Sequence, residues 1–267
     1  MLWLSMLSLG SARSDWLRLC LIGMRRLGPS HLGVLLLGLG VGLTGCQPAA
    51  STAKSDAQAQ LPAELSWPEQ IARVRQGQSE EIRLEQIPVP PNDLSQLAEL
   101  KGLKTLILDA GLVDDAHVSS LAGLSGLEHL RLRSSPLSDQ GLVELASYRL
   151  DRLMILNIPQ AQPTARGLAA LAALPRIRQL RIAGRQIDDA AIASLLQWPA
   201  LTSLHLISPN ISEAALKTIA AMPELSSFYI DDCPLSDEAW EQLFRQRPQL
   251  HVHIDQAHHD RDPQPGH

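Results

Sequence analysis

The chain has 267 residues, of which 45% are hydrophobic and only 3% aromatic, and its formal net charge is −5. This length suffices for one or two ordinary domains, and the acidic balance excludes the general basic character of a nucleic-acid-binding protein. The three cysteines, Cys20, Cys46 and Cys233, are too few for a disulfide framework.

Residues 1–45 have the features of a secretory signal peptide. Arg25 and Arg26 directly follow Met24, and an apolar run of Leu, Gly and Val occupies residues 32–43. A basic start, a short apolar run and small residues before a processing point are typical of export signals. The run is shorter than the ~20 apolar residues that span a bilayer. Because the leader is already complete from Met24, we expect Met24 to be the true start.

The leader ends in Leu43-Thr44-Gly45-Cys46, which resembles the lipobox of bacterial lipoproteins. The resemblance implies a diacylglycerol on the Cys46 thiol, cleavage before Cys46, and a mature chain anchored to the membrane by lipid. Gln47 follows the cysteine in place of aspartate, which in Gram-negative lipoproteins points to the outer membrane. The alternative is an ordinary signal peptide in which Cys46 is present by chance.

A linker and a capping helix are predicted next. Residues 46–62 hold the cysteine and a stretch rich in Ala, Ser and Gln without apolar periodicity, so we expect them to be flexible. Residues 63–78 are predicted to contain a helix over 67–75, with Pro68 near its first turn. Since a repeat array exposes its core at both ends, this helix should cover the first repeat.

Residues 79–255 repeat every 24 residues, apart from one step of 26 around Tyr148 and Arg149. Three apolar positions recur in each unit, as in Leu103, Leu106 and Leu108. A residue suited to an N-cap follows, usually with an acid after it; these caps are Asp114, Ser138, Thr164, Asp188, Ser212 and Ser236. Apolar residues then recur at helical spacing. Each unit is therefore predicted to be a strand, a turn and a capped helix.

This pattern resembles leucine-rich repeats, and its helical halves, such as residues 141–146 and 167–172, resemble the ribonuclease-inhibitor-like and bacterial GALA types. The resemblance implies an α/β solenoid, a horseshoe arc with parallel strands on the concave face and helices on the convex face. The Asn or Cys that often follows each strand in this family is mostly missing here. Cys233 fills that slot in one unit, so we expect it to be semi-buried and unreactive.

The residues between the buried strand positions are predicted to line the concave face in columns, because side chains alternate along a strand. One column is Arg83, Ile107, Arg131, Asn157, Arg181, His205, Tyr229 and His253. Tyr and Arg are enriched in contact surfaces. We therefore expect this face to bind a protein or peptide partner, with the following anchors: Arg131, Arg133, Arg181, His205 and Tyr229. The alternative is a solvated sheet face without a ligand.

The sequence contains no recognisable catalytic motif. A nucleophile elbow, a phosphate loop, a paired CxxC and HExxH are all missing, and the acids at helix starts are explained by capping. We therefore expect no enzymatic activity and no cofactor. His251, His253 and Asp255 alternate along the last predicted strand and are the candidates for a zinc or copper site. The alternative, which we favour, is an exposed edge strand and a soluble polar tail without a metal. Residues 256–267 are polar and are predicted to form a disordered tail.

Three functions are compatible with these features. The leading one is a membrane-anchored envelope lipoprotein whose leucine-rich-repeat domain binds a protein or peptide partner. The second is an envelope protein that binds metal through its C-terminal histidines. The third is a surface-displayed factor that interacts with a host.

Overall fold

The computed structural model describes residues 64–111 and 113–258. The predicted signal peptide, Cys46 and the whole predicted linker lie outside the described residues, as do residues 259–267. Within the described part of the chain, no helix combines the length and apolar character needed to cross a membrane.

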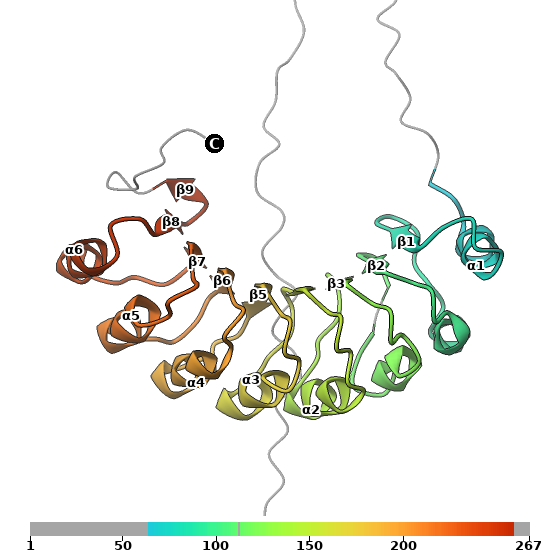
Figure 1. Ribbon diagram of the computed structural model, residues 1–267, viewed down its shortest axis with the longest axis horizontal. Coiled ribbons are helices and arrows are strands. Elements are labelled where there is room, and N and C mark those ends of the chain that lie inside the picture. The colour runs from blue at the N-terminus through green and yellow to red at the C-terminus, as the bar shows by residue number, and fades with distance from the viewer. Residues whose placement is uncertain (1–63, 112, 259–267) are drawn as a thin grey trace, which may run out of the picture. The chain divides into compact units, whose positions relative to one another are not determined.

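The strands form one sheet in which chain order is also spatial order (Figure 1). Parallel pairing joins the strands β1 (Glu81–Leu84), β2 (Thr105–Leu108), β3 (His129–Leu132), β4 (Ile155–Ile158), β5 (Gln179–Ala183), β6 (Ser203–Ile207), β7 (Ser227–Asp231) and β8 (His251–Ile254). The register joins residues one repeat apart, for example Leu106 with Leu130. The strand positions predicted from the repeat are therefore confirmed.

A short hairpin ends the sheet. Strand β9 (Ala257–His258) runs antiparallel to β8 and pairs His258 with His253. The chain reverses because Asp255 and Gln256 both take left-handed backbone conformations, with φ of 51° and 63°. The prediction of a disordered tail from Gln256 onward is therefore wrong for residues 256–258.

Helical segments follow the strands and pack along one side of the sheet (Figure 1). They are η1 (Pro91–Glu99), η2 (Val118–Leu121), α2 (Asp139–Ser147), α3 (Ala165–Leu171), α4 (Asp189–Ser194) with η3 (Leu195–Gln197), α5 (Glu213–Ala220) and α6 (Asp237–Gln246). The 26-residue step falls just after α2, where Arg149 has φ 51° and Leu150 is buried. The two extra residues of this repeat therefore lie in the loop between α2 and β4.

The capped α-helix predicted after Asp114 is absent from the described chain. Asp114 Oδ1 instead accepts a hydrogen bond from Ala116 N (3.0 Å) and lies 2.6 Å from His117 Nδ1. A side chain that bonds to a backbone N–H two residues later stabilises a turn in competition with a helix. The segment therefore forms a turn and the short 3-10 helix η2.

The inward strand residues and the apolar helix positions build one continuous core between the sheet and the helices. Leu106, Leu130 and Leu156 on successive strands are all fully buried, as are Leu142 and Leu168 on α2 and α3. One unit could not bury these side chains alone, so the repeats depend on their neighbours for stability.

Helix α1 (Trp67–Arg75) covers the first repeat. Trp67 and Ile71 are buried against it. The side chain of Gln70 pairs with the outer edge of β1: its Nε2 donates to Arg83 O (2.8 Å) and its Oε1 accepts from Arg83 N (2.7 Å). The amide group thus takes the place of a neighbouring strand at an edge that would otherwise present unpaired backbone.

Acids in the first helical turn fix the N-cap of the following repeat. Asp139 accepts hydrogen bonds from Thr164 N (2.8 Å) and Thr164 Oγ1 (2.6 Å), while Thr164 Oγ1 accepts from Arg166 N (3.1 Å). The same arrangement occurs in the pairs Asp115–Ser138 and Asp189–Ser212. Each acid therefore links two repeats. Asp139 and Asp189 also lie favourably at a helix N-terminus, whereas Asp115 lies in the turn before η2.

Candidate functional site

We call the side of the sheet that faces away from the helices the strand face. The register aligns its central column across the strands: Arg83, Ile107, Arg131, Asn157, Arg181, His205, Tyr229 and His253. This is the column predicted from the sequence. Ile107 departs from the expected exposure, because it is 1% exposed and offers nothing to a ligand.

A buried carboxylate holds the two arginines of β3. Arg131 Nη2 forms an ion pair with Asp109 Oδ2, and Arg133 Nη1 lies 3.8 Å from the same oxygen. The Asp109 side chain is 5% exposed, whereas that of Arg133 is 54% exposed. Arg131 therefore compensates an internal charge, and Arg133 is the arginine of this pair that is exposed to solvent.

A second carboxylate holds His205. His205 Nε2 lies 2.8 Å from Asp231 Oδ2, and its ring lies 5.5 Å from the ring of Tyr229. Burial lowers the pKa of His205 more than Asp231 raises it. The neutral imidazole therefore dominates at neutral pH; its Nε2–H donates to Asp231, which leaves Nδ1 as an acceptor.

A shallow hollow of about 190 Å³ lies at the centre of the strand face, lined by side chains that include Asn157, Arg181, His205 and Tyr229. Arg181 Nε and Asn157 Oδ1 are buried and have no hydrogen-bond partner among the described residues. Burial and, next, the positive charge of Arg133 lower the pKa of Arg181. The negative charge of Asp231 acts in the opposite direction but does not offset burial and the neighbouring arginines.

The structure divides the five predicted anchors into two groups. Arg181, His205 and Tyr229 line one hollow, while Arg131 and Arg133 share Asp109. The sequence places Asn157 in the central column, but reasoning from the sequence did not select Asn157, Asp109 or Asp231 as anchors. Asp109 directly follows β2 and Asp231 is the last residue of β7. Each lies diagonally across from a basic residue on the adjacent strand, which is a signal that the repeat register contains.

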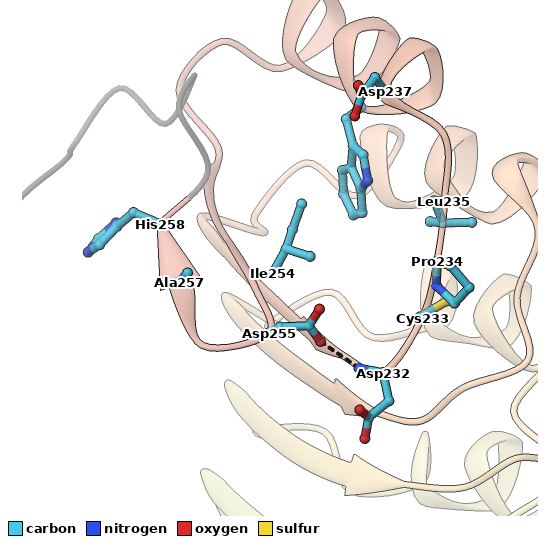
Figure 2. Close-up of a pocket in the computed structure, with 10 residues that line it drawn as sticks. Asp232, Cys233, Pro234, Leu235, Asp237, Ile254, Asp255, Ala257 and His258 are labelled. Carbon is cyan, nitrogen blue, oxygen red and sulfur yellow. Dashed lines mark hydrogen bonds between the residues drawn. The ribbon is translucent and has the colours of Figure 1, made fainter.

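A larger hollow of about 460 Å³ lies between the turn after β7, the start of α6 and the β8–β9 hairpin (Figure 2). Asp255 Oδ1 accepts a hydrogen bond from Asp232 N (2.8 Å) there. Cys233 is 9% exposed, and burial is the main cause that raises its thiol pKa. A protonated, buried thiol is a poor nucleophile, in line with the structural role predicted for Cys233.

Three histidines gather beside this hollow. His251 Nε2 and His253 Nε2 are 2.8 Å apart on β8, and the ring of His258 on β9 lies 4.0 Å from that of His253. Asp255, predicted to accompany His251 and His253, is not part of the group. Its φ of 51° lies outside the strand region, and its carboxylate bonds to the backbone of the preceding repeat.

Comparisons with known proteins identify the fold. No protein-family model and no curated protein sequence matches the chain. The chain is similar to the structure of the internalin InlF from Listeria monocytogenes, with 21% identity, 67% of this chain and 47% of that chain covered, and a TM-score of 0.52. It thus spans about half the length of that protein. This likeness confirms the predicted leucine-rich-repeat solenoid.

Two further structures are similar at lower TM-scores. Internalin C2 (InlC2) from Listeria monocytogenes has 26% identity, with 61% of this chain and 66% of that chain covered and a TM-score of 0.47. The plant peptide hormone receptor RGFR1, in complex with RGF2, has 14% identity, with 68% and 29% covered and a TM-score of 0.40.

Proposed function

We propose that this chain is a lipid-anchored envelope protein that binds an acidic segment of a protein or peptide partner on its strand face. In this proposal the solenoid is a horseshoe arc, and the strand face is its concave side. The protein acts by recognition and not as an enzyme.

The observation that carries the proposal is the central hollow with Arg181. A buried guanidinium Nε without a partner loses hydration without regaining a hydrogen bond, and this loss is costly for a charged group. A carboxylate of a partner would supply both the hydrogen bond and a further negative charge, with the planar geometry that arginine recognises well.

Neighbouring residues support an extended ligand on either side of that contact. Tyr229 offers a large, rigid side chain, and Asn157 offers a buried amide oxygen that accepts a hydrogen bond. Arg133, more than half exposed, adds a second positive charge in the direction of β3. A segment that crosses several strands would therefore meet cationic, amide and aromatic contacts in turn.

Selection from a random peptide library on the purified chain tests this proposal. We expect the bound peptides to be enriched in Asp and Glu, and Arg181→Met to weaken their binding by at least about tenfold, as for a central charged anchor. Arg166→Met, an exposed arginine on the helix side of the fold, is the matched control and should leave binding unchanged. Peptides without acidic enrichment, or equal effects of the two variants, would contradict the proposal.

The membrane anchor rests on the lipobox-like Leu43-Thr44-Gly45-Cys46 and on the linker that follows it. We propose that acylated Cys46 holds the solenoid at the outer membrane, since several acyl chains anchor a protein stably. Labelling of cells with a fatty-acid analogue should mark the native chain and Cys233→Ser but not Cys46→Ser. Label retained in Cys46→Ser would exclude this anchor.

A further inference from the structure

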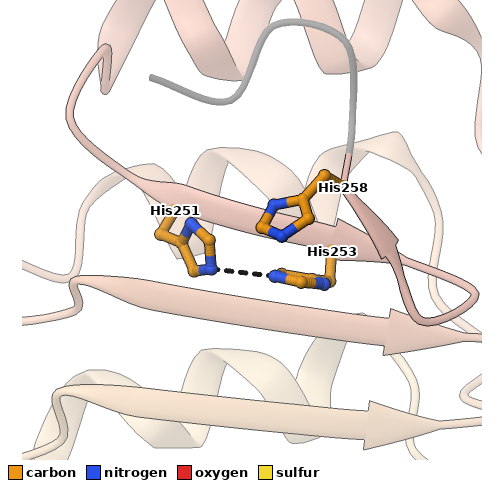
Figure 3. Close-up of side chains that lie close together, drawn as sticks. All are labelled: His251, His253 and His258. Carbon is orange, nitrogen blue, oxygen red and sulfur yellow. Dashed lines mark hydrogen bonds between the residues drawn. The ribbon is translucent and has the colours of Figure 1, made fainter. Parts of the chain in front are cut away.

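The end of the solenoid brings three imidazoles together from two strands. His251 and His253 come from β8 and His258 from β9, and Figure 3 shows the three rings turned toward a common space. Each can direct one ring nitrogen to that space, and the three nitrogens all lie within 4.8 Å of one another. Sequence spacing brings only the first two together; the third arrives because the chain reverses at Asp255 and Gln256.

We propose that His251, His253 and His258 form a binding site for a divalent transition-metal ion, with Zn²⁺ as the natural occupant. Zinc takes imidazole nitrogen at about 2.0–2.1 Å in tetrahedral geometry, which sets two such ligands about 3.3 Å apart. The observed separation of 2.8 Å between His251 Nε2 and His253 Nε2 is close to that value. Small side-chain rotations would bring all three nitrogens into place.

The surroundings favour an ordered ligand set. His251 is 7% exposed, and the ring of Tyr229 stacks on that of His253 with centroids 4.7 Å apart and an interplanar angle of 30°. Two of the three ligands are therefore held by packing before an ion arrives, which reduces the ordering cost of binding. Three imidazoles suit zinc, copper or nickel and not calcium or magnesium, which prefer oxygen ligands.

A bound ion would fasten the end of the fold. Strand β9 has only two residues, and its pairing with β8 is the last contact of the described sheet. An ion shared by His258 and the two histidines of β8 would link these strands. An ion that binds the folded state and not the unfolded state stabilises the folded state by mass action. The site does not depend on the proposed partner, so either proposal can fail without the other.

Calorimetric titration of the full chain with Zn²⁺ tests the site, with His258→Gln as the main variant. His258 belongs to a short edge strand, so its replacement preserves the core. We expect binding of one ion by the native chain and at least about tenfold weaker binding by His258→Gln. The control His129→Gln replaces the histidine of β3 that occupies the position equivalent to His251, and it should bind as the native chain does.

A second measurement locates the ion. Zn²⁺ should slow amide hydrogen exchange in β8 and β9 of the native chain and leave exchange in His258→Gln unchanged. The proposal is overturned if His258→Gln binds Zn²⁺ as tightly as the native chain. It is also overturned if a variant lacking His259 and His267 loses the binding, because the tail would then hold the ion.

Discussion

At the residue scale, the acid in one repeat and the cap of the next act as one unit. Asp139 accepts hydrogen bonds from Thr164 N, Thr164 Oγ1 and Gly167 N. We predict that Asp139→Ala lowers the free energy of unfolding by about 2 kcal/mol, because backbone and hydroxyl donors lose their acceptor. Urea denaturation followed by circular dichroism measures this change.

The matched control for that variant is Asp237→Ala. Asp237 is also in the first turn of its helix, α6, but no further repeat cap follows it in the described chain. Asp237→Ala removes only the favourable interaction of a carboxylate with the helix N-terminus. Its free energy of unfolding should therefore fall by less than about 1 kcal/mol. Equal costs in the two variants would show that the bonds between repeats contribute nothing.

His205 gives the protein a predictable pH dependence. Its pKa is lowered in the folded state, chiefly by burial, from an ordinary value of 6.5. As the pH falls below that value the unfolded state takes up the proton first, so stability decreases until the pH passes the folded pKa. His205→Gln should therefore lose less stability than the native chain between about pH 7.5 and pH 5.5.

Urea midpoints at the two pH values measure this difference. His129 also has a lowered pKa, again mainly because of burial, so some acid sensitivity should persist in His205→Gln. A larger loss of stability in the variant would mean that the contact with Asp231 outweighs burial and that the folded pKa of His205 is raised.

At the element scale, α1 closes the first strand edge through one side chain. Gln70→Ala removes both hydrogen bonds to Arg83 and the one to Leu65 O. We predict a loss of about 1–3 kcal/mol, because partly buried backbone groups of β1 lose their partners. Amide exchange in β1 should accelerate while exchange in β5 stays unchanged. Gln76→Ala, at the exposed C-cap of the same helix, should alter neither; faster exchange in that control would attribute the effect to α1 as a whole.

Most elements follow directly from the sequence, and the exceptions have local causes. The period of the apolar residues defines the strands, and Ser138, Thr164, Asp188, Ser212 and Ser236 cap helices as predicted. The side chain of Asp114 forms a turn of its own, which spacing alone does not reveal. Only the structure explains why glycine occupies position 167: a Cβ there would lie 2.4 Å from Asp139 Oδ1 of the preceding repeat.

At the scale of the whole molecule, the solenoid was predictable because each repeat makes the same local choices and pairs with its neighbours in register. The strand-face column follows from alternation along the strands. The interactions of the side chains in this column do not follow from alternation. Whether Arg131 is free or paired, for example, depends on Asp109 at the end of the neighbouring strand. The histidine cluster likewise depends on a reversal of the chain, so His258 could not be assigned from the pattern of β8.

The central claim is that the strand face, and not the helix side, meets the partner. Photo-crosslinking amino acids at positions 133, 181 and 229 of the chain, expressed in its native cells, test it directly, with positions 166, 217 and 241 on the helices α3, α5 and α6 as controls. We predict that the strand-face positions crosslink one common protein at an acidic segment and that the helix positions do not. Crosslinks to that protein from the helix positions alone would contradict the account.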